Sequence, residues 1–64
     1  MTGGMEDPVR RLRHDLSNPL SAILAETQLL LLNADQLDGE TVTSLKEIER
    51  LARRMRDMLQ QTKS

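Results

Sequence analysis

Cysteine and all three aromatic residues are absent from this 64-residue sequence. Without cysteine, the chain can form neither a disulfide framework nor a thiolate metal site. Without phenylalanine, tyrosine or tryptophan, it has no platform on which nucleic-acid bases could stack and none of the usual aromatic anchors of a small-molecule pocket. We therefore expect that this chain binds no cofactor and no metal ion.

A dominant charge and a long apolar run are also missing. Nine Lys and Arg residues face ten Asp and Glu residues, which is unlike the basic surfaces that bind phosphate backbones. The longest apolar run is the leucine tract of residues 29–32, whereas a membrane-spanning helix needs about 20 apolar residues. We expect no nucleic-acid partner, no membrane contact by this segment, and a cytoplasmic location.

Helical periodicity dominates the first half of the chain. Apolar residues and one threonine recur three or four positions apart, the spacing of an amphipathic helix, at Val9, Leu12, Leu16, Leu20, Ile23, Thr27 and Leu30. Asp7 is suited to the N-cap and Pro8 to the first helical position, where its missing N–H has no intrahelical partner. We expect a first helix over about 8–33, preceded by a flexible leader of residues 1–6.

A second helix is predicted over about 39–62. Residues 34–38 contain turn formers and interrupt the period, so we place a turn there. Asp38 is the expected N-cap, and Glu40 in the first turn meets the positive end of the helix dipole. The helical spacing then resumes at Val42, Leu45, Ile48, Leu51 or Ala52, Met55 and Leu59.

The apolar surface is wider than one hairpin needs. A short connection makes the two helices antiparallel neighbours, and further apolar residues lie outside the narrow stripes at Leu24, Leu29, Leu31, Leu32 and Met58. A chain of this size hides only about 60% of the surface that its unfolded form exposes. We predict an all-α fold in which the antiparallel hairpin of residues 7–64 forms a homodimeric four-helix bundle. Centring the turn on residues 36–37 puts Ala25 level with Ile48 and His14 level with Leu59.

The single histidine lies in residues 14–20, His-Asp-Leu-Ser-Asn-Pro-Leu. Its neighbours one or two helical turns away are all polar, namely Arg10, Arg11, Ser17, Asn18 and Ser21. Leu12 and Leu16, two positions away on either side, face roughly the opposite direction. The spacing predicts that His14 is exposed on a polar stripe and does not belong to the core; a surface histidine without chemistry is the alternative.

Pro19 follows the histidine within the predicted helix. A proline there removes one N–H and collides with the carbonyl of the residue four positions back, here Asp15, at a cost of about 3 kcal/mol. The collision falls next to His14. We interpret Pro19 as a local helix bend at the site; a tolerated kink in a surface helix is the alternative.

Residues 14–20 resemble the H-box of the histidine kinase dimerisation and phosphoacceptor family. That motif reads His, then Glu or Asp, two variable residues, Asn, Thr or Arg, Pro and Leu. The likeness covers about residues 9–62, although the second-helix segment of residues 45–59 is generic on its own. It implies a part of an ATP-dependent two-component sensor histidine kinase, whose ATP-binding catalytic domain, with ATP and Mg²⁺, has no counterpart in this chain.

The resemblance implies roles for three residues. His14 would accept the γ-phosphoryl group of ATP on Nε2 and pass it to an aspartate of a response-regulator receiver domain. Asp15 would accept a hydrogen bond from the other ring nitrogen and stabilise the developing charge. Asn18 would orient the water that attacks the regulator's phospho-aspartate. Phosphoryl transfer depends on positioning and charge stabilisation, which an exposed helix face can provide.

The resemblance also implies a partner-binding surface below the histidine. It would comprise small or polar residues of the first helix and charged residues of the second, namely Ser21, Ala22, Ala25, Glu26, Glu49, Arg50 and Arg53. A merely solvated surface is the alternative. The basic run of Arg50, Arg53, Arg54 and Arg56 is interpreted as a solvated or dimer-flanking face in preference to a phosphate site.

Two other interpretations stay open. In the first, the chain is a dimeric helical-hairpin interaction module in which His14 has no chemistry. In the second, His14 binds a metal ion with Asp15 or Asn18. The second is disfavoured, because consecutive residues splay apart on a helix and no further His or Glu completes a ligand set.

Overall fold

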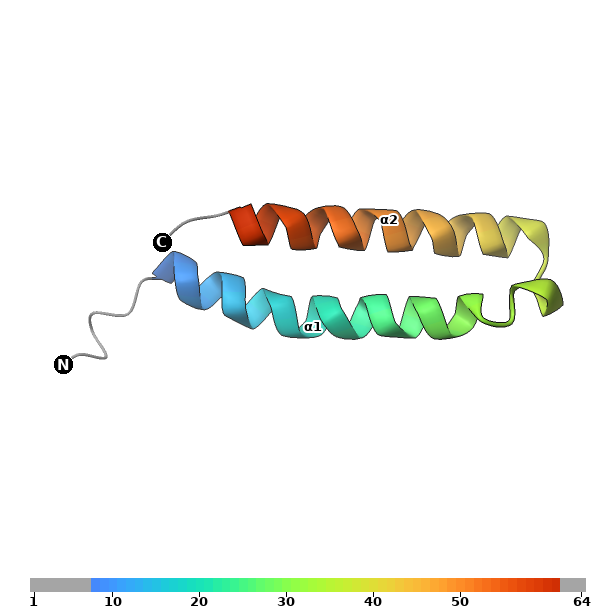
Figure 1. Cartoon of the computed structure of the whole chain (residues 1–64), viewed down its shortest axis with the longest axis horizontal. Helices are drawn as coiled ribbons and strands as arrows, with labels where there is room; N and C mark the ends of the chain where they lie inside the picture. The colour runs from blue at the N-terminus through green and yellow to red at the C-terminus, as the bar shows by residue number, and fades with distance from the viewer. Residues whose placement is uncertain (1–7, 62–64) are drawn as a thin grey trace.

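The computed structural model describes residues 8–61. They form helix α1 (Pro8–Leu31), a short 3-10 helix η2 (Ala34–Gln36) and helix α2 (Gly39–Gln61). Figure 1 shows α1 and α2 lying side by side and antiparallel, with η2 in the connection between them. The prediction of an all-α helical hairpin is confirmed. The predicted leader, the N-cap at Asp7 and the last residue of the predicted second helix, Thr62, lie outside the described residues.

The first helix ends two residues earlier than the sequence pattern predicts. The N–H of Leu32 donates to the carbonyls of both Gln28 and Leu29 at 3.2 Å, and the N–H of Asn33 donates to the carbonyl of Leu30 at 3.1 Å. Acceptors three residues back tighten the last turn of a helix and end it. The connection then makes one 3-10 turn over η2, so it is more ordered than the plain turn predicted for residues 34–38.

The start of α2 is capped by Asp38, as predicted. Its Oδ1 accepts a hydrogen bond from the N–H of Thr41 at 2.6 Å, and its carbonyl accepts one from the N–H of Val42 at 3.1 Å. Glu40 lies in the first turn of α2. Hydrogen bonds from Thr41, its side chain first and its backbone second, hold the pKa of Asp38 below its usual value. The cap therefore favours the charged carboxylate.

The buried residues lie in the seam between the two helices. Leu20, Leu24 and Ala52 are at most 7% exposed, and Leu59 packs against them. Thr27 is also buried, and its hydroxyl donates to the carbonyl of Ile23 at 2.7 Å, so no hydroxyl is left unpaired there. Partly buried residues continue the seam at alternating spacings of three and four, namely Arg13, Ser17 and Leu31 on α1 and Val42, Leu45 and Glu49 on α2.

A second apolar stripe lies outside the seam. The large exposed hydrophobic side chains on α1 and α2 include Val9, Leu12, Leu16, Ile23, Leu30, Ile48, Leu51, Met55 and Met58. The prediction of a single apolar stripe on the first helix is therefore wrong in one respect, because the predicted residues belong to two different stripes. Leu20 and Thr27 belong to the seam, and the other five predicted residues belong to the exposed stripe. Spacings of three and four fit two adjoining stripes of one helix equally well.

The register of the hairpin is offset from the predicted one by about one helical turn. Gln28 Nε2 donates to Glu49 Oε2 at 3.3 Å, whereas centring the turn on residues 36–37 would have put Gln28 level with Leu45. The connection, residues 32–38, is longer than the predicted turn of residues 34–38 because α1 ends at Leu31. At the other end of the hairpin the α2 residue that shares a hollow with His14 is Gln60, one position from the predicted Leu59, and Leu59 packs into the seam.

Candidate functional site

His14 lies near the N-terminal end of α1 and is exposed, as predicted. Its side chain is 78% accessible to solvent, and its Nδ1 lies 3.7 Å from Oδ1 of Asp15. That separation is too long for a hydrogen bond, yet a modest side-chain rotation would make one. Because Nδ1 is the nitrogen near the carboxylate, Nε2 is left on the opposite edge of the ring. The imidazole therefore offers a nitrogen to an external reactant.

Asp15 lies between two cationic or potentially cationic side chains. Its Oδ2 is 3.9 Å from Nε of Arg11, and its Oδ1 faces His14. All three side chains are more than 60% exposed, and ion pairs this exposed contribute little to stability. The cluster therefore adds little to the stability of the helix.

Pro19 lies inside α1, which stays helical across it from Pro8 to Leu31. Proline has no N–H, so the carbonyl of Asp15 receives no intrahelical hydrogen bond from that position. Nearby, the Ser17 hydroxyl donates to the carbonyl of Arg13 at 2.7 Å. A proline and a serine that bonds back to the preceding turn each promote helix bending. Figure 1 shows the first, blue turns of α1 inclined toward α2 relative to the rest of the helix.

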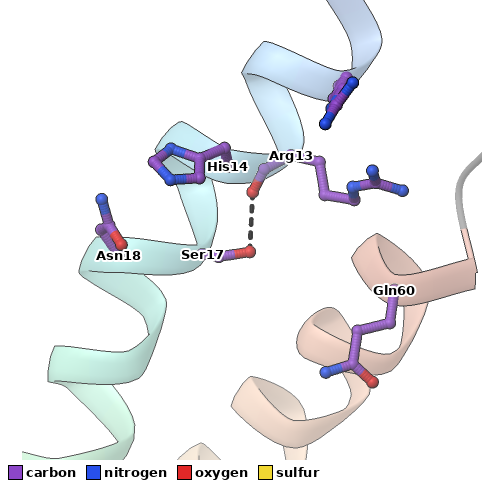
Figure 2. Close-up of a pocket in the computed structure, with 6 residues that line it drawn as sticks. Arg13, His14, Ser17, Asn18 and Gln60 are labelled. Carbon is purple, nitrogen blue, oxygen red and sulfur yellow. Dashed lines mark hydrogen bonds between the residues drawn. The ribbon is translucent and has the colours of Figure 1, made fainter. Parts of the chain in front are cut away.

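A polar hollow of about 370 Å³ opens beside His14. It is lined by Arg10, Arg13, His14, Ser17, Asn18 and Gln60. Figure 2 shows His14 and Asn18 pointing to the same side of α1, while Ser17 and Arg13 point toward the side where α2 presents Gln60. The structure thus brings the predicted phosphoacceptor and the predicted water-positioning residue to one face. No acidic side chain lines the hollow.

Further along the same side of α1 lies a groove of about 230 Å³. Its lining residues are Leu20, Ser21, Leu24, Ala25, Gln28 and Arg56. Two of the predicted partner-binding residues, Ser21 and Ala25, are among them. Ala22 and Glu26 are exposed but do not line this groove. They are one helical position further round α1 than Ser21 and Ala25, which turns them away from α2.

Sequence reasoning missed Arg56 as a residue of this groove. It was assigned to a solvated or dimer-flanking face, and Glu49, Arg50 and Arg53 were chosen as the α2 residues level with the groove. The structure places Arg56 beside Ser21 and Ala25. The error is the offset in register, since moving α2 by one turn brings Arg56 to the level that had been given to Arg53.

The three charged α2 residues chosen from the sequence are paired with neighbours. Glu49 Oε2 accepts hydrogen bonds from Gln28 of α1 at 3.3 Å and from Arg53 Nη2 at 3.2 Å. Arg50 holds Glu47 through two hydrogen bonds, of 3.0 and 2.6 Å. That bidentate contact lowers the pKa of Glu47 and raises the pKa of Arg50. These side chains form ordered pairs along α2 and between the helices.

The comparison with protein-family models identifies the family. Residues 6–63 match the model described as His Kinase A (phospho-acceptor) domain. The chain belongs to this family. Neither the curated proteins nor the solved structures gave a match. The resemblance seen in residues 14–20 is thereby confirmed at the level of the family. His Kinase A domains belong to histidine kinases, in which they generally dimerise and act with ATP-binding and receiver domains.

Two further observations concern the rest of this His Kinase A domain. Within residues 8–61, neither helix is long and apolar enough to cross a membrane. In the same part of the chain, no group of three or more His, Cys, Asp or Glu side chains is arranged to hold a metal ion. The individual roles given to His14, Asp15 and Asn18 stay predictions, as does the partner-binding role of the residues below them.

Proposed function

We propose that this domain is the dimerisation and histidine-phosphotransfer domain of a two-component sensor kinase. His14 accepts the γ-phosphoryl group of ATP, which a separate catalytic domain binds with Mg²⁺, and passes it to an aspartate of a response-regulator receiver domain. The observation that carries the proposal is the position of His14. It lies in the segment of residues 14–20 that resembles the family's phosphoacceptor motif, inside the matched range 6–63, and its imidazole is 78% exposed on the helix.

The geometry at His14 supports attack through Nε2. The lone pair of Nε2 forms a bond to the γ-phosphorus, and the bond from that phosphorus to the bridging oxygen breaks, so ADP leaves with the electron pair. The ring carries the positive charge that develops. Asp15, whose Oδ1 is 3.7 Å from Nδ1, is placed to hold the proton on Nδ1 and stabilise that charge. An exposed imidazole also leaves room for a bulky donor domain to approach.

Onward transfer and the later hydrolysis of the regulator's phospho-aspartate use the same face. A carboxylate of the receiver domain attacks the phosphorus, and the bond to Nε2 breaks to return neutral His14. Asn18 lies one turn along and points to the same side of α1 as His14 (Figure 2). There its amide is placed to orient the water that hydrolyses the receiver's phospho-aspartate. The groove with Ser21 and Ala25 continues this side of α1 and offers small side chains to an approaching helix.

The exposed apolar stripe supports the dimerisation part of the proposal. Large hydrophobic side chains on both helices, such as Ile23 at 50% and Met55 at 50% exposed, lie outside the seam of the hairpin. The seam itself buries only Leu20, Leu24 and Ala52 among the hydrophobic side chains of residues 8–61. A second copy packed on the stripe would give the four-helix bundle and supply the burial that one hairpin lacks.

The test is phosphorylation by the separately expressed catalytic domain of the parent kinase with radiolabelled ATP. The chain should be labelled, and the label should be lost in acid and survive in base, as a phosphoramidate does. His14→Gln should abolish labelling with unchanged helical content, because the side chain is exposed. Ser17→Ala should retain the label. Labelling of Ser17 or Ser21 in place of His14 would contradict the assignment, and a stable dimer without any label would favour the interaction-module alternative.

A further inference from the structure

Two arginines line the hollow beside His14. Arg10 and Arg13 lie in its wall together with the histidine, and its other lining residues, Ser17, Asn18 and Gln60, are uncharged. The whole chain has a formal net charge of -1. The lining of the hollow, with two guanidinium groups and no carboxylate, is therefore more positively charged than the chain as a whole. Its chemistry suits an anion.

Arg10 and Arg13 lie near the N-terminal end of α1, where the helix dipole disfavours positive charge. Arg10, Arg11 and Arg13 all lie within the first six residues of α1, whose first turn contains no acidic residue. Cations stabilise the C-terminal end of a helix and oppose the partial positive charge of the N-terminal end. Arg11 has a nearby carboxylate in Asp15. For Arg10, neither an ion pair with residues 8–61 nor the helix dipole gives a structural reason for the positive charge.

Arg10 is four residues before His14, so the two side chains lie on one face of α1, about 5–6 Å apart at Cβ. The side chain of a helical residue leans toward the N-terminus of its helix, which directs His14 toward the turn of Arg10. The hollow of about 370 Å³ leaves space next to the ring. A phosphoryl group on Nε2 of His14 would therefore fall within reach of a guanidinium that offers several N–H donors.

We propose that Arg10 is a phosphate-binding residue that holds the phosphoryl group carried by His14. The proposal rests on the proposed function, and it adds a residue outside the phosphoacceptor motif. The guanidinium neutralises part of the charge of the phosphorylated imidazole and slows its loss to water. Arg13 also lines the hollow, but its side chain points toward α2 and not toward His14 (Figure 2).

The experiment phosphorylates the chain chemically, so that it needs no kinase. Phosphoramidate transfers its phosphoryl group to Nε2 of His14: the new N–P bond forms, the N–P bond of the reagent breaks, and ammonia leaves after taking up a proton. The half-life of phospho-His14 is then measured at constant pH and salt by ³¹P NMR. In Arg10→Gln the phosphoryl group should be lost about two- to fivefold faster than in the wild type, the size expected for an exposed charge pair. Arg10→Lys should restore part of the difference.

The matched control is Arg54→Gln, which removes the same charge from an exposed position on α2 outside the hollow. Its phospho-His14 should decay at the wild-type rate. The side-chain Nε–H signal of Arg10 should also move on phosphorylation of the wild type and stay in place in reagent-treated His14→Gln. The proposal would be overturned if phospho-His14 decayed at the same rate in the wild type, Arg10→Gln and Arg54→Gln. It would also be overturned if Arg10→Gln and Arg54→Gln accelerated the decay equally. Since no catalytic domain is present, failure of ATP-dependent labelling would count against the proposed function alone.

Discussion

Gln28 of α1 and Glu49 of α2 join the two helices through a hydrogen bond of 3.3 Å between Nε2 and Oε2. Glu49 is half-buried in the seam, and the same oxygen also accepts from Arg53 at 3.2 Å. This polar contact favours one register of the hairpin, because sliding α2 by one turn would separate Gln28 from the carboxylate. The register in turn decides that Arg56 lies beside Ser21.

The first prediction concerns that contact. Gln28→Ala and Glu49→Ala should each lower the melting temperature, and the double variant should lose less than the sum of the two. The coupling should be about 0.5–1 kcal/mol, typical of a partly exposed hydrogen bond to a charged group. Glu47 provides the control, since its partner Arg50 is on the same helix. The effects of Gln28→Ala and Glu47→Ala should be additive. Additive effects of Gln28→Ala and Glu49→Ala would show that the contact is not formed in solution.

The second prediction concerns the exposed apolar stripe. Ile48→Asp should dissociate and unfold the domain together, because the dimer proposed above would bury an unpaired carboxylate in its shared core. Sedimentation equilibrium should give twice the chain mass of 7.3 kDa for the wild type and a single chain mass for the variant. Lys46→Asp places the same residue two positions away on the opposite side of α2 and should remain dimeric. A well-folded wild-type monomer at micromolar concentration would refute the bundle.

The third prediction is a pH dependence from the cap of α2. Hydrogen bonds from Thr41 lower the pKa of Asp38 in the folded chain, so the carboxylate adds stability above its unfolded pKa of about 3.9. That stability is lost as the pH falls through the lower, folded value. Asp38→Asn keeps an oxygen acceptor for the cap without the titration. The melting temperature of the wild type should therefore exceed that of Asp38→Asn by a few degrees at neutral pH, and the two should converge in acid. Parallel curves across this range would contradict the assignment.

The fourth prediction concerns Asp15, whose carboxylate lies 3.7 Å from Nδ1 of His14. Asp15→Asn should slow phosphorylation of His14 by the catalytic domain about 10²- to 10⁴-fold, because the amide cannot stabilise the charge on the ring. Rates are measured in single turnovers with saturating ATP. Asp57→Asn removes an exposed carboxylate from α2 and serves as the control. An unchanged rate in Asp15→Asn would remove this residue from the mechanism.

The fifth prediction separates the two activities assigned to the His14 face. Asn18→Ala in the full kinase should reduce dephosphorylation of the partner regulator and leave phosphorylation of His14 within a few fold. Asn18 lies one turn beyond the histidine, where its amide can orient water at a docked phospho-aspartate but cannot serve as a base for the ring. Both rates and the melting temperature are measured on the same variant. A parallel fall in all three would make Asn18 a structural residue of the bend at Pro19.

Much of the fold could be predicted from the sequence because its signals are local. The helical spacing, Pro8 at the first position of α1 and the cap at Asp38 all depend on residues within one turn of each other. The exposure of His14 also follows from its neighbours on one helix. The seam and the exposed apolar stripe could not be told apart in this way. A helix with two adjoining apolar stripes gives the same spacing whichever stripe faces its partner.

The register was harder to predict for a different reason. It depends on how many residues the connection uses, and a 3-10 turn at Ala34–Gln36 uses them differently from the plain turn that was assumed. An error of one turn does not change the fold, but it exchanges the α2 residues that face the site. Arg56 was missed and Arg53 was chosen for this reason. Long-range placement of side chains therefore needed the three-dimensional structure, even in so simple a hairpin.

The gap that Pro19 makes in the hydrogen-bond ladder of α1 has a consequence for local unfolding. Residues 8–18 contain no buried side chain, and the buried part of the seam begins at Leu20. In a single hairpin, opening of the first turns should therefore cost little of the free energy that holds the two helices together, and we expect those amide protons to exchange with solvent before the ones around Leu24. In the proposed dimer, Val9, Leu12 and Leu16 would be covered by the second copy, so dimerisation would stabilise the segment of α1 that carries His14.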